Sequence, residues 1–235
     1  MARTRSRSNR RLFALLLLLA GAVAGWQWLK AHPEHNPWAP LDLSHLQGWA
    51  TRSKLVSLRT NVAECRAVLA RSDVAFTALA PEGEGPCART DRTQLGRYPL
   101  APDTPPVTCP VAAALELWRR NTVIPAARTI LGSEIKQIEH LGAFSCRRMY
   151  GGADGPWSEH ATANAIDIAA FVLADGRRIS VLEDWDGDDE EARFLRAVRD
   201  GACGSFATVL SPDYNAAHAD HFHFDQDDRW AGVCR

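Results

Sequence analysis

The pattern of hydrophobic and polar positions divides the chain into three parts. An apolar run, Leu12–Leu29, covers 18 residues and approaches the length that crosses a bilayer as a helix. Residues 30–55 follow without a clear period and contain three prolines, which predicts a linker that ends in a short helix. Residues 56–235 show helical and strand periods and predict one folded domain, with its core at 109–235.

The folded part combines two kinds of pattern. Helical spacing of apolar residues, or a proline that opens a helix, predicts helices at 58–71, 109–118, 125–132 and 192–198. Alternation and short apolar runs predict strands at 74–79, 134–141, 166–173, 178–182, 206–210 and 221–224. Together these elements predict an α+β domain in which a small antiparallel sheet is flanked by helices.

Charge is distributed unevenly, although the formal net charge is only −1. Five arginines lie within the first 11 residues, which contain no acidic residue. The rest of the chain carries 22 basic and 28 acidic residues, a net charge of −6, which argues against nucleic-acid binding by the folded part. Basic residues before an apolar run are typical of a membrane-inserted segment, with residues 1–11 kept in the cytoplasm.

Two interpretations of the apolar run remain open. Ala22-Val23-Ala24 has the small-x-small form of a signal-peptide cleavage site. Trp26 and Trp28 extend the run toward spanning length, and tryptophan is frequent at membrane interfaces, which favours an uncleaved signal anchor at residues 12–29. Both interpretations predict that the folded domain is exported.

The six cysteines all lie beyond the apolar run and are well separated. No CxxC pair occurs, which argues against a thiolate metal site or a thioredoxin-like motif. An even number in an exported chain predicts three disulfides. Because pairing of neighbours closes only local loops, we expect the pairs Cys65–Cys87, Cys109–Cys146 and Cys203–Cys234.

Three of the eight histidines lie within six consecutive residues near the C-terminus. Alternate side chains of a strand point to the same face, which places His221 and His223 together. Phe222 and Phe224 then face the core. His218 lies in the turn that enters this strand. From there it can reach the cleft that the face with His221 and His223 would line.

His160 and Asp167 form a second polar group, earlier in the chain. Their odd spacing would put them on opposite faces of one strand, so they converge only if the chain bends at residues 161–164. Ile166 and Ile168 flank the aspartate, and burying an unpaired carboxylate there costs on the order of several kcal/mol. Because neutral imidazole and carboxylate are zinc ligands, the two polar groups together predict a zinc site in a cleft.

These motifs carry a family resemblance. Ser158-Glu159-His160 with Asp167 resembles the SxH-x6-D motif of the zinc D,D-peptidase superfamily, which implies a D,D-peptidase/Hedgehog-like fold with a zinc cleft on the sheet. His218-x-x-His221-x-His223 resembles the HxxHxH motif of penicillin-insensitive murein endopeptidases. The run from Cys109 to Asp225 is similar to the extensin-like C-terminal domain family, with Cys-Pro before a helix and Cys-Arg before the first motif.

The resemblance implies a role for each residue of the motifs. His160, Asp167 and His223 are implied as ligands of Zn²⁺, with water in the fourth position. His221 shares their face and is implied to stabilise an oxyanion or to transfer protons.

The general base and the substrate contacts are less closely defined by the resemblance. Many members of the superfamily place a glutamate three residues before the last ligand, where this chain has Asp220, and the endopeptidase branch uses the position of His218 instead. Both residues therefore remain candidates for the base. Arg147 or Arg148 would bind a substrate carboxylate, and Ser158 would bind substrate or orient the first ligand.

The motifs and the predicted export indicate a zinc-dependent metallopeptidase that hydrolyses a cell-wall peptide bond involving D-amino acids, with peptidoglycan as its partner. Endopeptidase and carboxypeptidase action both remain open. The alternative is a non-catalytic peptidoglycan-binding module with a structural zinc. We expect a monomer in the bacterial inner membrane with its domain in the periplasm, or secreted to the periplasm if the signal is cleaved.

Overall fold

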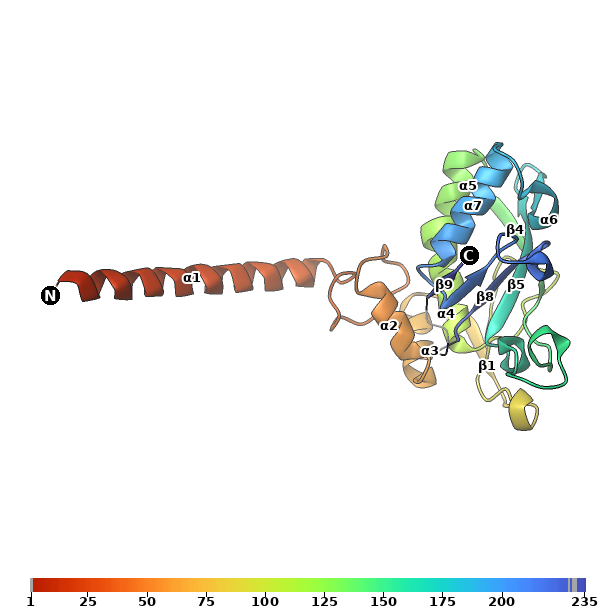
Figure 1. The fold of residues 1–235 in the computed structure, drawn as a ribbon, viewed down its shortest axis with the longest axis horizontal. Helices are drawn as coiled ribbons and strands as arrows, with labels where there is room; N and C mark the ends of the chain where they lie inside the picture. Colours follow the sequence, from red (N-terminus) through yellow and green to blue (C-terminus); the bar gives the residue numbers. More distant parts are fainter. Residues whose placement is uncertain (1, 228, 230–231) are drawn as a thin grey trace.

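Helices predicted by spacing and strands predicted by alternation pack together as an α+β fold in the computed structural model (Figure 1). The structure describes residues 2–227, 229 and 232–235, with only the backbone for residues 2–8. The helices are α1 (Ala2–Ala31), α2 (Thr51–Leu58), α3 (Val62–Arg71), α4 (Cys109–Trp118), α5 (Ile124–Ile130), α6 (Val181–Asp184) and α7 (Glu190–Ala202). The strands are β1 (Phe76–Leu79), β2 (Arg92–Leu95), β3 (Leu100–Ala101), β4 (Ile135–Gly142), β5 (Ala165–Leu173), β6 (Arg178–Ser180), β7 (Thr208–Leu210), β8 (Phe222–Asp225) and β9 (Val233–Cys234).

Helix α1 contains the predicted apolar segment and extends away from the other elements (Figure 1). Its stretch Asn9–Ala31 has 23 residues and a mean hydropathy of 1.9, which is long and apolar enough to cross a membrane. The apolar side chains of this stretch are not buried against the rest of the described chain. The helix therefore has the length and exposure of a membrane anchor, and a signal sequence would have the same features.

Residues 30–55, which we expected to be a linker, are in part built into the domain. Leu41 and Leu43 belong to the same buried core as the helices, and the backbone N–H of Leu43 donates to Ser72 Oγ at 2.8 Å. The short helix expected at the end of this segment is α2, which begins at Thr51. The prolines break the period of the segment, but burial of its leucines still stabilises the folded state.

A seven-stranded sheet carries the strands of both histidine motifs, in the order β3-β4-β5-β8-β7-β9 with β6 beside β5. The central pairs β4–β5, β5–β8 and β7–β8 are antiparallel, as predicted. At the edges β3 pairs with β4, and β9 with β7, in parallel, so the sheet is mixed rather than antiparallel throughout. The predicted sheet lacked these edges because two-residue strands show no alternation.

Helices α4, α5 and α7 cover one face of the sheet (Figure 1). Helix α4 is buried along its whole length, and the ring of its Trp118 contacts Phe171 and Phe224 at centroid distances of 6.0 and 5.2 Å. Its indole N–H donates to the Val198 carbonyl of α7 at 2.8 Å. Through these contacts the helices pack on one face of β5 and β8. The polar residues of the two strands lie on the opposite face.

The cysteines pair differently from the neighbour-to-neighbour expectation. Cys203–Cys234 forms as predicted, but Cys65 pairs with Cys109 and Cys87 with Cys146. Helix α3 packs against α4, which brings Cys65 to Cys109 across 44 positions of sequence. The expected pairs Cys65–Cys87 and Cys109–Cys146 were wrong because helix packing, rather than loop length, decides which thiols meet.

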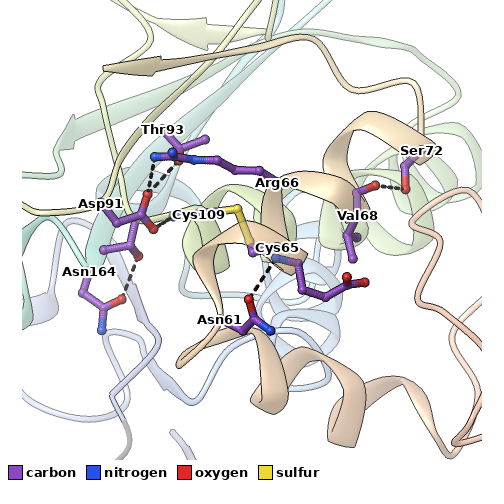
Figure 2. The surroundings of a disulfide bond; sticks show 11 residues. Asn61, Cys65, Arg66, Val68, Ser72, Asp91, Thr93, Cys109 and Asn164 are labelled. Atoms are coloured by element: carbon purple, nitrogen blue, oxygen red, sulfur yellow. Dashed lines mark hydrogen bonds and ion pairs between the residues drawn. A yellow bond between two sulfur atoms is a disulfide. The ribbon is translucent and has the colours of Figure 1, made fainter. Parts of the chain in front are cut away.

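Polar contacts around the first disulfide connect these helices to the loop before β5 (Figure 2). The buried carboxylate of Asp91 accepts from the backbone N–H of Cys109 at 2.5 Å and from the Arg66 guanidinium at 3.0 Å. The neighbouring Thr108 hydroxyl donates to Asn164 Oδ1 at 2.8 Å. The disulfide region therefore supports the bend that precedes β5.

Candidate metal centre

The antiparallel register of β5 and β8 places Asp167 directly opposite His223. Both side chains face away from the core, as the predicted alternation requires. The side chains that flank them on the two strands are fully buried: Ile166, Ile168, Phe222 and Phe224. The alternation predicted for both strands is confirmed at these positions.

His160 reaches the same point from the loop before β5. It lies in a short 3₁₀ turn, Glu159–Thr162, in which Ser158 Oγ accepts from the His160 backbone N–H at 3.3 Å. Ala163 follows with a φ of 57°, in the left-handed region, and redirects the chain into β5. The bend expected at residues 161–164 is therefore present.

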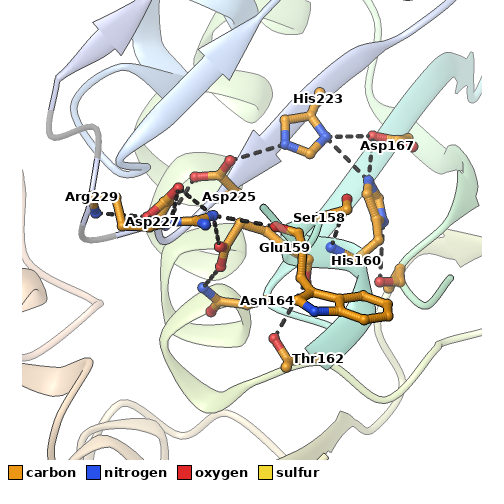
Figure 3. A network of polar contacts seen from close by, with 12 residues as sticks. Ser158, Glu159, His160, Thr162, Asn164, Asp167, His223, Asp225, Asp227 and Arg229 are labelled. Atoms are coloured by element: carbon orange, nitrogen blue, oxygen red, sulfur yellow. Dashed lines mark hydrogen bonds and ion pairs between the residues drawn. The ribbon is translucent and has the colours of Figure 1, made fainter. Parts of the chain in front are cut away.

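Three ligand atoms converge at this point (Figure 3). His160 Nε2 lies 3.1 Å from Asp167 Oδ1 and 3.1 Å from His223 Nδ1, and the latter two atoms are 3.0 Å apart. Tetrahedral zinc with bonds of about 2.0–2.1 Å separates its ligand atoms by about 3.3 Å. The observed triangle fits zinc with a small outward movement of each ligand.

Each histidine ring has an inner nitrogen in the ligand triangle and an outer nitrogen that points away from it. The contact of the outer nitrogen decides whether the inner nitrogen of the neutral ring carries a lone pair. His160 Nδ1 lies 3.1 Å from the Ala143 carbonyl, and His223 Nε2 lies 3.0 Å from Asp225 Oδ2. Because both partners only accept, these outer nitrogens hold the protons, and the inner nitrogens of the neutral rings carry lone pairs. With both rings neutral, two lone pairs and a carboxylate oxygen would face one another without a donor, so the triangle favours a cation, either a second proton on His223 or a metal ion.

The electrostatics of the centre point the same way. Burial opposes charge on the His223 ring, but hydrogen bonds to Asp167 and Asp225, and their negative charges, outweigh it and raise the pKa of His223 to about 9. Burial also favours the neutral form of Asp167, but hydrogen bonds from His160 and His223 and their charges hold the pKa of this carboxyl below its usual range. The centre therefore favours a positive charge beside an ionised carboxylate, which is the role a divalent metal fills.

The converging side chains line a cleft of about 390 Å³. His218, His221 and Arg147 also line it, whereas Asp220 and Arg148, both described by the structure, lie outside its lining. The structure thus brings most of the predicted site residues to one cleft. Of the two candidates for the base, and of the two candidate arginines, one lines the cleft and the other does not.

His221 lies next to the ligand triangle. Its Nε2 is 3.7 Å from Asp167 Oδ1, and its Nδ1 is 2.7 Å from the carboxylate of Asp220. Asp220 is itself exposed and precedes β8. Its carboxylate therefore orients the His221 ring instead of entering the cleft.

His218 faces the cleft from the turn before β8. Its Nδ1 lies 2.8 Å from Asn215 Oδ1, an acceptor that holds the ring proton there and leaves Nε2 with a lone pair. Burial, helped by the positive charges of His223 and His221, lowers the pKa of His218 to about 4. The ring is therefore neutral at neutral pH.

The two predicted arginines have different surroundings. Arg147 is exposed at the cleft, and its guanidinium makes no hydrogen bond or ion pair with any described residue. Arg148 lies over the ring of Trp157 at 4.6 Å and donates to the Gly155 carbonyl. Arg147 is thus the one available to a ligand, and Ser158 lines the same cleft.

Three supporting groups were missed by sequence reasoning. Asp225 follows His223 by two residues on the same strand, so alternation already placed both on one face. Asn215 precedes His218 by three residues, a spacing that a turn brings together. The Ala143 carbonyl has no signal in the sequence, because any residue would supply it.

An outer network links the two ligand segments (Figure 3). Arg229, after β8, donates to Glu159 Oε1 at 2.6 Å and pairs with Asp227 at 2.9 Å, and Asn164 donates to Glu159 Oε2 at 2.6 Å. Burial, together with the charges of Asp227 and Asp225, raises the pKa of Glu159. The network ties the 3₁₀ turn before β5 to the segment that follows β8.

The family model of the extensin-like protein C-terminus matches residues 63–235. The chain belongs to this family. The match begins well before the run from Cys109 that carried the resemblance, and it includes the whole candidate centre of this extensin-like domain. No curated protein and no solved structure matches the chain.

Proposed function

We propose that this extensin-like domain is a zinc-dependent peptidase that hydrolyses a peptide bond of peptidoglycan involving D-amino acids. The observation that carries the proposal is the triangle of His160, Asp167 and His223, whose inner nitrogens are freed by acceptors on their outer sides. Three protein ligands beside an open cleft are typical of a catalytic zinc, whereas a structural zinc is enclosed by four. The motif likeness to zinc D,D-peptidases supports the same conclusion.

Zinc bound there would polarise the scissile carbonyl and lower the pKa of a bound water. His218, held by Asn215, presents Nε2 to the cleft and would accept the proton of the attacking water. His221, whose Nδ1 is held by Asp220, would act as the imidazolium and donate a hydrogen bond from Nε2 to the oxygen on which negative charge develops. In this assignment Asp220 acts through its histidine neighbour, and His218 is the base.

Arg147 extends the proposal to substrate binding. Its unpaired guanidinium at the cleft would bind a carboxylate of the cell-wall peptide through two parallel hydrogen bonds. Ser158, whose backbone N–H donates to the Arg147 carbonyl at 3.1 Å, lines the same cleft. A substrate carboxylate would thereby be fixed relative to the scissile bond.

The proposed location is the periplasmic side of a bacterial inner membrane. Helix α1 has the length of an anchor, and its basic N-terminus favours retention in the cytoplasm. Three disulfides suit an oxidising compartment. Peptidoglycan lies in the same compartment.

Digestion of purified sacculi and cross-linked muropeptides, with mass analysis of the products, tests the function. We expect the zinc-loaded chain to release products of one defined bond cleavage, a chelator to stop the reaction and zinc to restore it. Asp167→Ala should be inactive. His45→Ala replaces an exposed histidine between α1 and α2, distant in sequence from the proposed ligands, and should match the wild type. Zinc-loaded protein that sediments with sacculi without cutting them would contradict hydrolysis and support the binding-module alternative.

A further inference from the structure

The segment that joins α1 to α2 (Figure 1) carries large apolar side chains that are exposed. Trp38, Leu46 and Trp49 are 74, 78 and 64% exposed, and all lie within residues 38–49. An indole ring left in water next to similar neighbours marks an interaction surface more often than a solvated one. We refer to these three residues as the apolar collar.

Two residues of the collar, Trp38 and Trp49, lie beside the end of the candidate membrane span. The ring of Trp38 is 6.5 Å from that of Trp26 in α1, measured between centroids. His35 stacks between Trp28 of α1 and Trp49, at 5.3 and 6.0 Å. Trp26 lies five residues before the end of α1, so the chain folds back along about 7.5 Å of the helix.

The segment that carries the collar is fixed to the turn after α1. The Lys54 ammonium donates to the Pro33 carbonyl at 2.7 Å, and the backbone N–H of Trp49 donates to His35 Nδ1 at 3.3 Å. At Gly48 a Cβ atom would lie 2.4 Å from the Glu34 carbonyl oxygen, so only glycine permits this approach. The collar is therefore held beside the helix end by side-chain and backbone contacts.

The position of the apolar collar beside α1 indicates which partner would cover it. Trp26 and Trp28 lie inside the stretch Asn9–Ala31, and tryptophan concentrates where the acyl chains meet the headgroups. A ring packed against Trp26 lies at nearly the same depth as Trp26 itself. We propose that the apolar collar docks the domain onto the headgroup interface of the bilayer that α1 crosses. This docking is independent of the proposed peptidase activity.

Fluorine NMR of the full-length chain, labelled with 5-fluorotryptophan in phosphatidylcholine nanodiscs, tests the docking. Single Trp→Phe variants assign the resonances, and a lipid with a nitroxide on its headgroup reports proximity. We expect the resonances of Trp38 and Trp49 to be lost to broadening, while those of Trp157 and Trp185 keep their intensity. Equal intensities for all four would overturn the proposal. A mature chain that lacks α1 and is recovered in the soluble fraction, not with the membrane, would overturn it as well.

Hydrogen exchange of residues 36–49 in the same nanodiscs gives a matched comparison. Leu46→Ser should lose the protection that the bilayer gives to this segment. Leu182→Ser removes an equally large side chain that is 64% exposed on α6, and should leave the protection unchanged. Equal protection in both variants would contradict docking. Protection that requires two chains in one nanodisc would assign the collar to a second copy and overturn the proposal.

Discussion

The chain gathers histidines at two places, and the two groups have opposite surroundings. At the cleft, His160 and His223 are mostly buried, and each outer nitrogen contacts an acceptor. At the end of α1, His32 and His35 lie among tryptophan rings, and their carboxylate neighbour is Glu34, at 3.2 and 3.9 Å. One group therefore presents lone pairs to a common point, and the other provides stacking surfaces.

Spacing does not distinguish these groups. His32-x-x-His35 and His218-x-x-His221 have the same separation, yet only the second leads into a strand whose next outward residue, His223, meets a carboxylate. The difference lies in the supporting acceptors and in the neighbouring strand that carries Asp167. Supporting groups orient and free the ligand atoms, so they decide which histidines can bind metal.

Removal of a proposed ligand is expected to have the largest effect. His160→Ala deletes one of the three converging atoms, and a divalent cation held by two ligands in an open cleft is lost readily. Zinc content after dialysis, measured by elemental analysis, should fall to background in this variant. His35→Ala is the matched change at the other group and should keep the zinc content of the wild type. Equal losses in both variants would contradict the assignment of the metal to the cleft.

Removal of the carboxylate behind His223 should weaken the site without abolishing it. Asp225→Ala frees Nε2 of the ring, so the proton is no longer directed away from the metal. We expect zinc affinity to fall about 10- to 100-fold in competition with a chelator. Glu34→Ala, at the membrane end, is the control and should change nothing. An unchanged affinity in Asp225→Ala would mean that β8 alone orients the ring.

Zinc binding at the cleft should also depend on pH. Because the metal-free His223 has a raised pKa of about 9, zinc must displace a proton from it at any lower pH. Affinity should therefore rise by up to about tenfold per pH unit and level off near pH 9. Competition titrations across this range measure the slope. A flat profile would contradict a protonated His223 in the metal-free chain.

The sequence allowed the site to be predicted better than the framework around it. Alternation in 166–168 and 222–224 was enough to pair Asp167 with His223, because a period of two fixes the face of every side chain. That period changes further along β5, where His140 faces Ile168 and Glu139 faces Ala170, which leaves Ala169 as an extra residue. Phe171 consequently joins the core, a shift that no local pattern announces.

Long-range partners explain the remaining differences. Cys65 meets Cys109 because two helices pack, and the Ala143 carbonyl meets His160 because β4 ends beside the bend. Neither contact is encoded by residue type at a spacing. Asp225 was within reach of the same alternation that placed His223, but the ligand motif ended at His223, two residues before it.

The smallest expected effect concerns the stacking role of the membrane-end histidines. In His35→Ala the ring between Trp28 and Trp49 is lost, together with the acceptor for the Trp49 backbone N–H. Because the stack is partly exposed, we expect a loss of about 1 kcal/mol or less in the free energy of unfolding, measured by denaturant titration of the full chain in detergent. His45→Ala, in which the replaced ring stacks on no described residue, should change it less. Equal stabilities of the two variants would mean that the joint between α1 and the domain depends on backbone contacts. Addition of zinc should not change the difference in stability between the variants, since neither ring belongs to the cleft.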